Sequence, residues 1–262
     1  MHIEVAGEST YCYTNSRNID PAKPSIVFIH GSGMDHTVWT LASRHFARHG
    51  NNVVSVDLPG HGRSSGRPLA SIEAMAAWIF EVLDALELSQ AALVGHSLGS
   101  LIALECAARH PERVRALALV GTTSPMPVSD AILDAAEADD HAAFDMLTQW
   151  GFSKRHQFGG NRNSGIWMIG NTLRLYERSK PGVLHHDMRA CNEYTEGTAA
   201  AAKVTCPTLL ILGAEDRLTP VRSTRALQDA IPNAMVEVLP GAGHTIMVEA
   251  PNAMLDALHQ VI

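Results

Sequence analysis

The stretch AALVGHSLGSLIALECAAR, residues 91–109, decides the fold because a single serine separates a strand pattern from a helix pattern. AALV is a continuous apolar run, which is typical of a strand covered on both faces. The residues after Ser97 have helical periodicity, and Gly95 and Gly99 flank the serine. Glycine has no side chain to obstruct a tight turn, so the pattern predicts a strained turn that exposes the Ser97 hydroxyl.

Other apolar runs repeat the strand pattern along the chain. Two runs near the N-terminus, HIEVA (2–6) and STYCYT (9–14), predict a hairpin. Further strands are predicted at 25–29, 52–56, 91–94, 115–120, 208–212 and 235–239, and helices at 71–88, 98–109, 221–231 and 251–261. Strands that alternate with helices predict an α/β fold with a mostly parallel sheet and right-handed crossovers.

One long interval breaks this alternation. Residues 122–203 contain loop signals and helical stretches but no apolar strand run. The interval is too long for a simple connection. We therefore expect residues 1–121 and 204–262 to form the core, and residues 122–203 to form a helical cap inserted into it.

Composition and charge limit the classes of function. The chain has 262 residues, of which 46% are hydrophobic, and this fits one large domain or a domain with an insertion. The formal net charge of −7 argues against nucleic-acid binding, which usually needs a basic face. No run reaches the roughly 18–20 apolar residues of a membrane span, and residues 1–10 lack the pattern of a secretory signal. A soluble, cytoplasmic protein with reduced cysteines is expected.

A second glycine-containing loop follows the strand predicted at 25–29. It reads His30-Gly31-Ser32-Gly33, and its glycines let the main chain approach a ligand closely. The backbone N–H of Ser32 and that of Leu98, at the start of the helix after Ser97, are the expected donors of an oxyanion hole.

Two loops late in the chain supply an acid and a base. Asp216 lies four residues after the strand at 208–212, and His244 lies five residues after the strand at 235–239. A serine hydroxyl needs a base to take its proton, and the base needs an anion to orient it. All these loops follow strands, so they should meet at one edge of the sheet. Ser97, Asp216 and His244 are therefore predicted to be nucleophile, orienting acid and base.

The chain resembles the α/β-hydrolases over nearly its whole length apart from 122–203. Besides the loops above, DLPGHGRS (57–64) and ARHPERVRALALVG (108–121) are similar to segments of that family. The resemblance implies an eight-stranded, mostly parallel sheet with the hairpin at one edge. Its G-x-x-D pattern favours Asp216 over the adjacent Glu215 as the acid, and it gives Asp57 a structural role. For His96, which lies beside the nucleophile, a packed side chain is expected rather than a second base.

The resemblance also narrows the reaction. Members that displace halide or open epoxides use an aspartate where this chain has Ser97. A serine implies acyl transfer, so we expect an enzyme that hydrolyses a small, largely apolar carboxylic ester without a metal or cofactor. An enol-lactone hydrolase, a C–C bond hydrolase, a cofactor-free perhydrolase and a methyl-ester hydrolase of a carrier-bound acyl chain are alternatives. A non-catalytic small-molecule receptor is the alternative outside enzymes, and the oligomeric state is not predicted.

The cap is expected to select the substrate. Some of its large apolar side chains should face the cleft, and the candidates are Trp150, Phe152, Phe158, Trp167, Met168, Tyr176, Met188 and Tyr194. A substrate carboxylate could be held by a cap arginine, among Arg155, Arg162, Arg174 and Arg178. The run His185-His186-Asp187 lacks the spacing of a metal site, so packed or solvated side chains are expected there.

Overall fold

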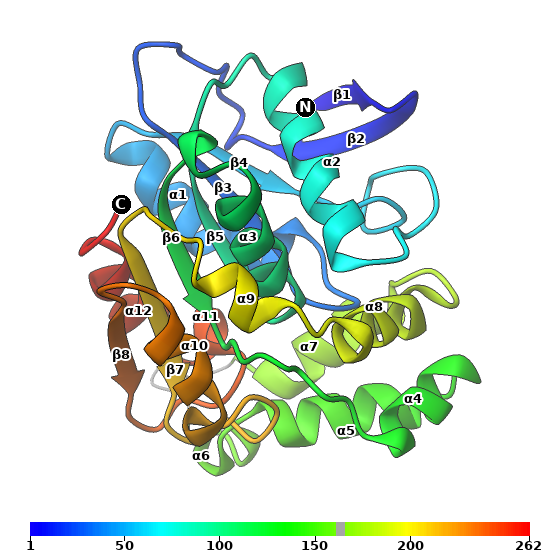
Figure 1. Cartoon of the computed structure of the whole chain (residues 1–262). Helices are drawn as coiled ribbons and strands as arrows, with labels where there is room; N and C mark the ends of the chain where they lie inside the picture. The colour runs from blue at the N-terminus through cyan, green and yellow to red at the C-terminus, as the bar shows by residue number, and fades with distance from the viewer. Residues whose placement is uncertain (161–165) are drawn as a thin grey trace.

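An eight-stranded sheet crosses the whole molecule in the order β1-β2-β4-β3-β5-β6-β7-β8 (Figure 1). The structure is a computed structural model that describes residues 1–160 and 166–262. The strands are β1 (His2–Val5), β2 (Glu8–Tyr13), β3 (Ser25–Ile29), β4 (Asn52–Val56), β5 (Ala91–His96), β6 (Val114–Val120), β7 (Thr208–Gly213) and β8 (Met235–Leu239). The pairs β1–β2 and β2–β4 are antiparallel and the others are parallel, which confirms the predicted sheet with its hairpin at one edge.

Helices cover both faces of this sheet. They are α1 (Thr40–Arg48), α2 (Ile72–Ala85), α3 (Leu98–Arg109), α10 (Arg225–Ala230), α11 (Ile246–Glu249) and α12 (Pro251–Leu258), with 3₁₀ helices at η1 (His36–Trp39), η2 (Pro111–Arg113) and η3 (Val221–Thr224). Val27 and Ile29 pack in the cluster that contains α2 and α3, whereas Ile26 and Phe28 pack in the cluster that contains α1 and α12. Successive side chains on a strand point to opposite faces, so burial of both faces explains the continuous apolar runs.

Two elements differ from the sequence predictions. Helix α1 was not predicted, because its buried face consists mainly of small side chains while Leu41 is 56% exposed. Strand β8 was predicted as a buried run, but Met235, Val236 and Val238 are each at least 36% exposed. β8 is the last strand of the sheet, so one of its edges has no neighbouring strand.

The interval between β6 and β7 is helical, as predicted. It contains α4 (Asp130–Glu137), α5 (Ala142–Gly151), α6 (Lys154–Gln157), α7 (Met168–Glu177), α8 (Val183–Glu193) and α9 (Gly197–Ala201). Figure 1 shows α4 to α8 beyond the carboxyl ends of the strands, where open α/β sheets bind ligands. Helix α9 packs against α3 of the core. The insert therefore lies over the edge at which the predicted site residues meet.

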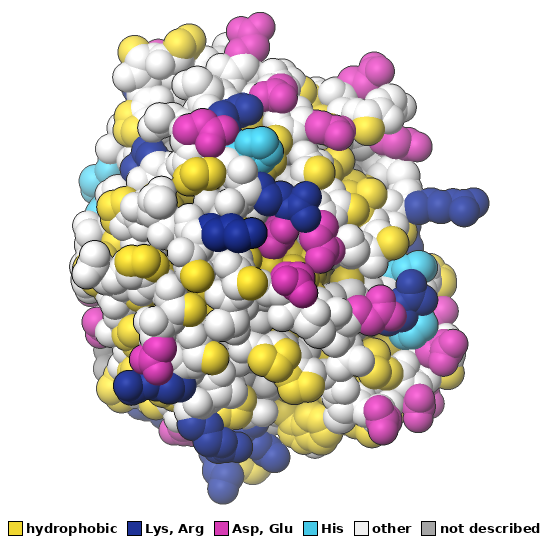
Figure 2. All heavy atoms as spheres, in the orientation of Figure 1, with side chains coloured by type: hydrophobic (Ala, Val, Ile, Leu, Met, Phe, Trp, Pro, Cys, Tyr) yellow, Lys and Arg dark blue, Asp and Glu magenta, His cyan; other side chains and the backbone are white. Residues whose placement is uncertain are grey.

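The surface carries charges of both signs. On the face in Figure 2, acidic and basic side chains lie interspersed around a central hollow. Across the described residues, no helix combines the length and apolar character that crossing a membrane would require.

Candidate active site

Ser97 occupies the turn between β5 and α3. Its backbone has φ +52° and ψ −118°, a combination that side-chain-bearing residues rarely adopt. A Cβ on Gly95 would overlap the carbonyl oxygen of Gly99, and a Cβ on Gly99 would overlap that of Ile29. Both flanking glycines are therefore required by close backbone contacts, and the turn is as tight as the sequence predicted.

Asp216 and His244 form a buried pair beside this turn. The His244 Nδ1–H donates to Asp216 Oδ2 at 2.8 Å, and the Thr219 hydroxyl donates to the same oxygen at 2.6 Å. The backbone N–H groups of Leu218 and Thr219 each donate to Asp216 Oδ1 at 2.8 Å. Burial alone would raise the pKa of the Asp216 carboxyl, but His244 and these hydrogen bonds lower it to about 2. Asp216 is thus an anion that holds the His244 ring in one orientation.

Thr219 was not among the predicted site residues. Its hydroxyl lies 3.1 Å from His244 Nδ1 as well as on Asp216, so it contacts both members of the pair. The available signal was local, because backbone donors two and three residues after an aspartate are typical of an Asx-type turn. Glu215, the rival acid, is exposed and accepts a hydrogen bond from the Lys154 N–H at 3.3 Å. The structure therefore brings Asp216, and not Glu215, to His244.

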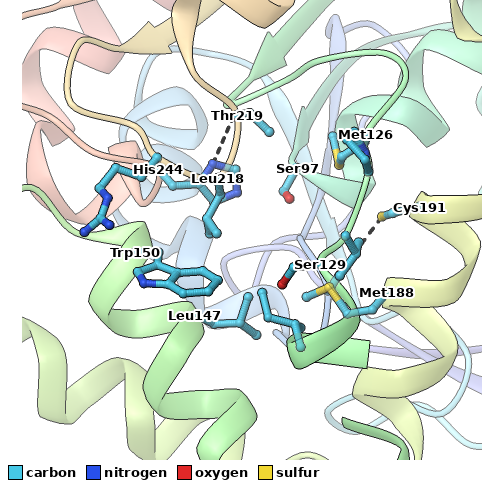
Figure 3. Close-up of a pocket in the computed structure, with 15 residues that line it drawn as sticks. Ser97, Met126, Ser129, Leu147, Trp150, Met188, Cys191, Leu218, Thr219 and His244 are labelled. Atoms are coloured by element: carbon cyan, nitrogen blue, oxygen red, sulfur yellow. Dashed lines mark hydrogen bonds between the residues drawn. The ribbon is translucent and has the colours of Figure 1, made fainter. Parts of the chain in front are cut away.

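Ser97 and His244 both line a cavity of about 170 Å³ (Figure 3). Figure 3 shows both side chains at its wall, facing apolar groups from the insert. The other lining residues are Ser32, Met126, Pro127, Val128, Ser129, Ile132, Leu147, Trp150, Met188, Cys191, Arg217, Leu218 and Thr219. Burial raises the pKa of the Cys191 thiol to about 12, so this cysteine is not a thiolate at neutral pH. Ser97 is therefore the cavity's candidate nucleophile.

The loop that contains Ser32, residues 30–33, packs closely against the turn that carries Ser97, here called the serine turn. A Cβ on Gly31 would lie 2.7 Å from His96 Nδ1 and 3.3 Å from the Ser97 Cβ, so only glycine fits without displacement. Ser32 lines the cavity, and Leu98 is the fully buried first residue of α3. The two predicted oxyanion donors thus belong to two segments next to Ser97, the loop at residues 30–33 and the start of α3.

His96 is fully buried, as expected for a packed side chain. Its Nε2–H donates to the His244 carbonyl oxygen at 3.0 Å, and the two rings lie 4.7 Å apart. Burial and the neighbouring His244 lower the pKa of His96 to about 3. His96 is therefore neutral, and it supports the main chain of the loop that carries His244, residues 240–245, here called the base loop.

The insert holds the base loop as well as lining the cavity. The His244 N–H donates to the Gly151 carbonyl oxygen, at the end of α5, at 2.6 Å. A Cβ on Gly243 would lie 2.7 Å from the Ser153 nitrogen, so its absence lets the insert approach this closely. Glu249 accepts the N–H groups of both Gly243 and Ser153 at 3.0 Å. The base loop and the insert therefore share one hydrogen-bonded unit.

Most of the cap residues considered for the cleft lie elsewhere. Trp150 and Met188 line the cavity, whereas Phe158 and Trp167 are 87% and 69% exposed. The remaining apolar candidates are buried away from the lining: Phe152, Met168, Tyr176 and Tyr194.

The expected arginines that the structure describes do not line the cavity either. Arg174 pairs with Glu177, Arg178 pairs with Asp35, and Arg155 donates to the Gly160 carbonyl oxygen. Arg162 lies outside the described residues. The lining arginine is instead Arg217, directly after Asp216, and its exposed position in a loop left no periodic signal in the sequence.

Two other buried acids lie outside the cavity lining. Asp57, at the end of β4, accepts hydrogen bonds from the backbone and ring of His36 and from the Arg63 N–H, and it does not line the cavity. Asp187 is buried and bonded to His61, whereas the preceding His186 is exposed. The structural role that the resemblance implied for Asp57 agrees with these contacts.

Comparison with known proteins places the chain in a family. Residues 24–251 match the model of the alpha/beta hydrolase fold. A pimeloyl-[acyl-carrier protein] methyl ester esterase of Chromobacterium violaceum is 32% identical, over 84% of this chain and 87% of the relative. A 2-hydroxymuconate semialdehyde hydrolase of a Pseudomonas species is 31% identical, over 86% of this chain and 81% of the relative.

Solved structures agree with this placement. The structure of a thermophilic esterase superimposes with a TM-score of 0.82 at 28% identity, over 99% of this chain and 95% of the other. The shared fold, the serine turn and the length of the match lead to one conclusion. The chain belongs to the alpha/beta hydrolase fold family.

Proposed function

We propose that this protein is a serine hydrolase that cleaves a small, largely apolar carboxylic ester through an acyl-enzyme. The observation that carries the proposal is the buried Asp216–His244 pair on the wall of the cavity that Ser97 faces. His244 takes the Ser97 proton as Oγ attacks the ester carbon, and it returns that proton to the leaving alcohol. Water, activated by the same base, then releases the acid and restores Ser97.

The developing oxyanion requires donors that are in place before the reaction. The backbone N–H groups of Ser32 and Leu98 fill this role in the proposal. Leu98 begins α3, so the positive end of the helix dipole adds to its effect. Losing one such donor typically costs about 3–4 kcal/mol of transition-state stabilisation. No step in this scheme needs a metal or cofactor.

The small volume of the cavity favours a substrate with a small acyl or alcohol group. Its volume of about 170 Å³ is below the roughly 300 Å³ at which drug-sized ligand pockets begin. Apolar side chains of the insert, such as Leu147 and Met188, form its far wall. We propose that residues 122–203 act as a lid that selects the substrate. The relative named as a methyl ester esterase supports a carboxylic ester as the bond that is cleaved.

A C–C bond hydrolase is the second candidate. The relative that acts on 2-hydroxymuconate semialdehyde favours it. Arg217 on the cavity wall could bind a carboxylate in such a substrate. The enol-lactone and perhydrolase alternatives share the same residues, and the non-catalytic receptor differs from all of them by the absence of turnover.

The test is hydrolysis of p-nitrophenyl esters from acetate to decanoate. We expect an optimum at a short chain, and a loss of ~10,000-fold or more in kcat for Ser97→Ala. Ser223→Ala, a surface serine on η3, is the matched control and should keep the parent rate. Ester turnover that survives Ser97→Ala would contradict the proposal. If the protein turned over vinylogous diketones and no ester, the second candidate, a C–C bond hydrolase, would replace the esterase.

A further inference from the structure

Asp187 is a buried carboxylate in the insert that contacts the loop of the oxyanion hole. It lies on α8, and its Oδ2 accepts the Gly33 N–H and the His61 Nε2–H, both at 2.8 Å. Its side chain is fully buried, and no described residue bonds its Oδ1. Burying a carboxylate costs desolvation energy, which packing alone does not recover. A role for Asp187 is therefore expected in the two groups that it binds, the Gly33 N–H and His61.

The contacts of the loop explain what Asp187 holds. His30 Nε2 accepts the Leu58 N–H at 3.2 Å, so its proton is on Nδ1, which donates to the Gly31 carbonyl oxygen at 2.8 Å. That carbonyl shares a planar trans peptide with the Ser32 N–H, which therefore points the opposite way. The next peptide is held by the bond from Gly33 to Asp187. Both peptides that flank the Ser32 α-carbon are thus tied, one to the core and one to the insert.

His61 supports Asp187 from the other side. Its Nδ1 lies 3.0 Å from the Pro59 carbonyl oxygen, and its Nε2 faces the carboxylate, so both ring nitrogens meet acceptors. An imidazole in this setting donates from both nitrogens only as the imidazolium. Burial lowers the pKa of His61, but the Asp187 charge and its hydrogen bond outweigh this effect and raise the pKa above its usual value. With His61 protonated, the two side chains form an ion pair that is anchored to the main chain at the Pro59 carbonyl oxygen and the Gly33 N–H.

We infer that Asp187, held by His61, is a positioning residue for the Ser32 N–H of the oxyanion hole. This inference rests on the proposed serine-hydrolase function. Helix α8 also carries Met188 and Cys191 in the cavity lining, and the Cys191 sulfur lies 3.9 Å from the Ser32 hydroxyl. The same helix thus lines the cavity in which the substrate would bind and orients the donor that would stabilise its oxyanion. The insert contributes to catalysis itself as well as to selection.

The test separates an oxyanion defect from a loss of stability. Asp187→Asn keeps one acceptor oxygen but removes the charge that faces His61. An alkyl trifluoromethyl ketone is the probe: Ser97 Oγ bonds to its carbonyl carbon, the Ser97 proton moves to His244, and the carbonyl oxygen becomes an oxyanion. The matching methyl ketone binds without this charge. We expect kcat and the affinity for the trifluoromethyl ketone to fall together by ~10–100-fold, with KM and methyl-ketone affinity within threefold.

A matched control removes a buried bond between the residue that follows α8 and the core. The Tyr194 hydroxyl donates to Glu105 Oε2 at 2.6 Å, away from the oxyanion loop. Tyr194→Phe should lower the melting temperature and leave kcat and trifluoromethyl-ketone affinity unchanged. If Asp187→Asn behaves like Tyr194→Phe, the inference is wrong.

A second variant covers the case in which Asp187→Asn does not fold. His61→Gln removes the imidazole but leaves the Asp187 carboxylate and its bond from the Gly33 N–H in place. We therefore expect a smaller effect, in which kcat and trifluoromethyl-ketone affinity fall together by ~3–10-fold. Parent values of both in folded His61→Gln would overturn the inference. A parent protein without ester turnover or ketone adduct would instead overturn the proposed function, which distinguishes the two failures.

Discussion

Ser97 has a backbone conformation that its Cβ makes costly. Residues with a side chain in sparsely populated φ/ψ regions cost of order 1–3 kcal/mol each. The surrounding contacts impose this geometry, since Gly95 and Gly99 already give the turn all the space that the backbone allows. The strained conformation puts the Ser97 hydroxyl in the cavity, and it lowers the stability of the folded protein.

The first prediction concerns this strain. Glycine adopts the Ser97 conformation without a Cβ, and it loses about 0.5–1 kcal/mol through greater freedom in the unfolded chain. We expect Ser97→Gly to have a free energy of unfolding ~1 kcal/mol higher than Ser97→Ala, which keeps the Cβ. Urea unfolding of both variants measures the difference. A lower value for Ser97→Gly would show that the strain at Ser97 is smaller than the entropic cost of glycine.

At the level of elements, the predictions succeeded where one pattern dominated. The runs at 25–29 and 52–56 coincide with β3 and β4 because both faces of these strands are covered. Ser71 caps α2 through a hydrogen bond from the Ala74 N–H at 3.2 Å, in line with the predicted helix start. Helix α1 was not predicted, because Phe46 is the one large apolar side chain among its buried residues and Leu41 faces solvent.

The candidate site was predictable only in part. Ser97, Asp216 and His244 stand in glycine-rich loops after strands, where parallel topology brings them to one edge. Asp187 and Arg217 have no such signal, since their positions depend on how the insert and a single loop fold over that edge. Contacts between distant segments do not follow from periodicity.

A second prediction belongs to the short helix α11. Glu249 binds Gly243 and Ser153 through their N–H groups, and His156 Nδ1 lies 2.8 Å from its Oε2. Glu249→Gln replaces one acceptor by a donor that faces other donors. We expect a loss of about 1–3 kcal/mol in the free energy of unfolding and ~10-fold in kcat/KM, because Gly243 precedes His244.

Urea unfolding and ester kinetics measure the two effects. Glu237→Gln, on the edge strand β8, is the control and should change neither quantity appreciably. An unchanged kcat/KM in Glu249→Gln would mean that the base loop keeps its geometry without this bond.

For the whole molecule, buried neutral histidines contribute to the response to acid. Burial and the neighbouring His61 lower the pKa of His30 to about 4, and burial with His244 lowers that of His96 to about 3. The unfolded chain binds these protons below pH ~6.5, while the folded protein does not. Their contribution to stability is therefore complete above pH ~6.5 and is lost as the pH falls toward 3–4.

The third prediction follows from this linkage. Each histidine should lower the free energy of unfolding by ~1.4 kcal/mol per pH unit between about pH 6 and 4.5. Urea unfolding across this range should show a shallower slope, by about one proton, in His96→Phe. His186→Phe, an exposed position on α8, should keep the parent slope. Identical slopes in His96→Phe and the parent would contradict a neutral buried His96.

The hydrogen bond from His244 to Gly151 also bears on how this enzyme family could diversify. A lid joined to the core only at its two ends could be exchanged as a cassette between relatives. Here the end of α5 is bonded to the base loop, and its close approach depends on the missing side chain of Gly243. A transplanted lid would have to match these main-chain positions. New specificities are therefore more accessible through single changes in the cavity wall, at positions such as Leu147, than through recombination of whole lids.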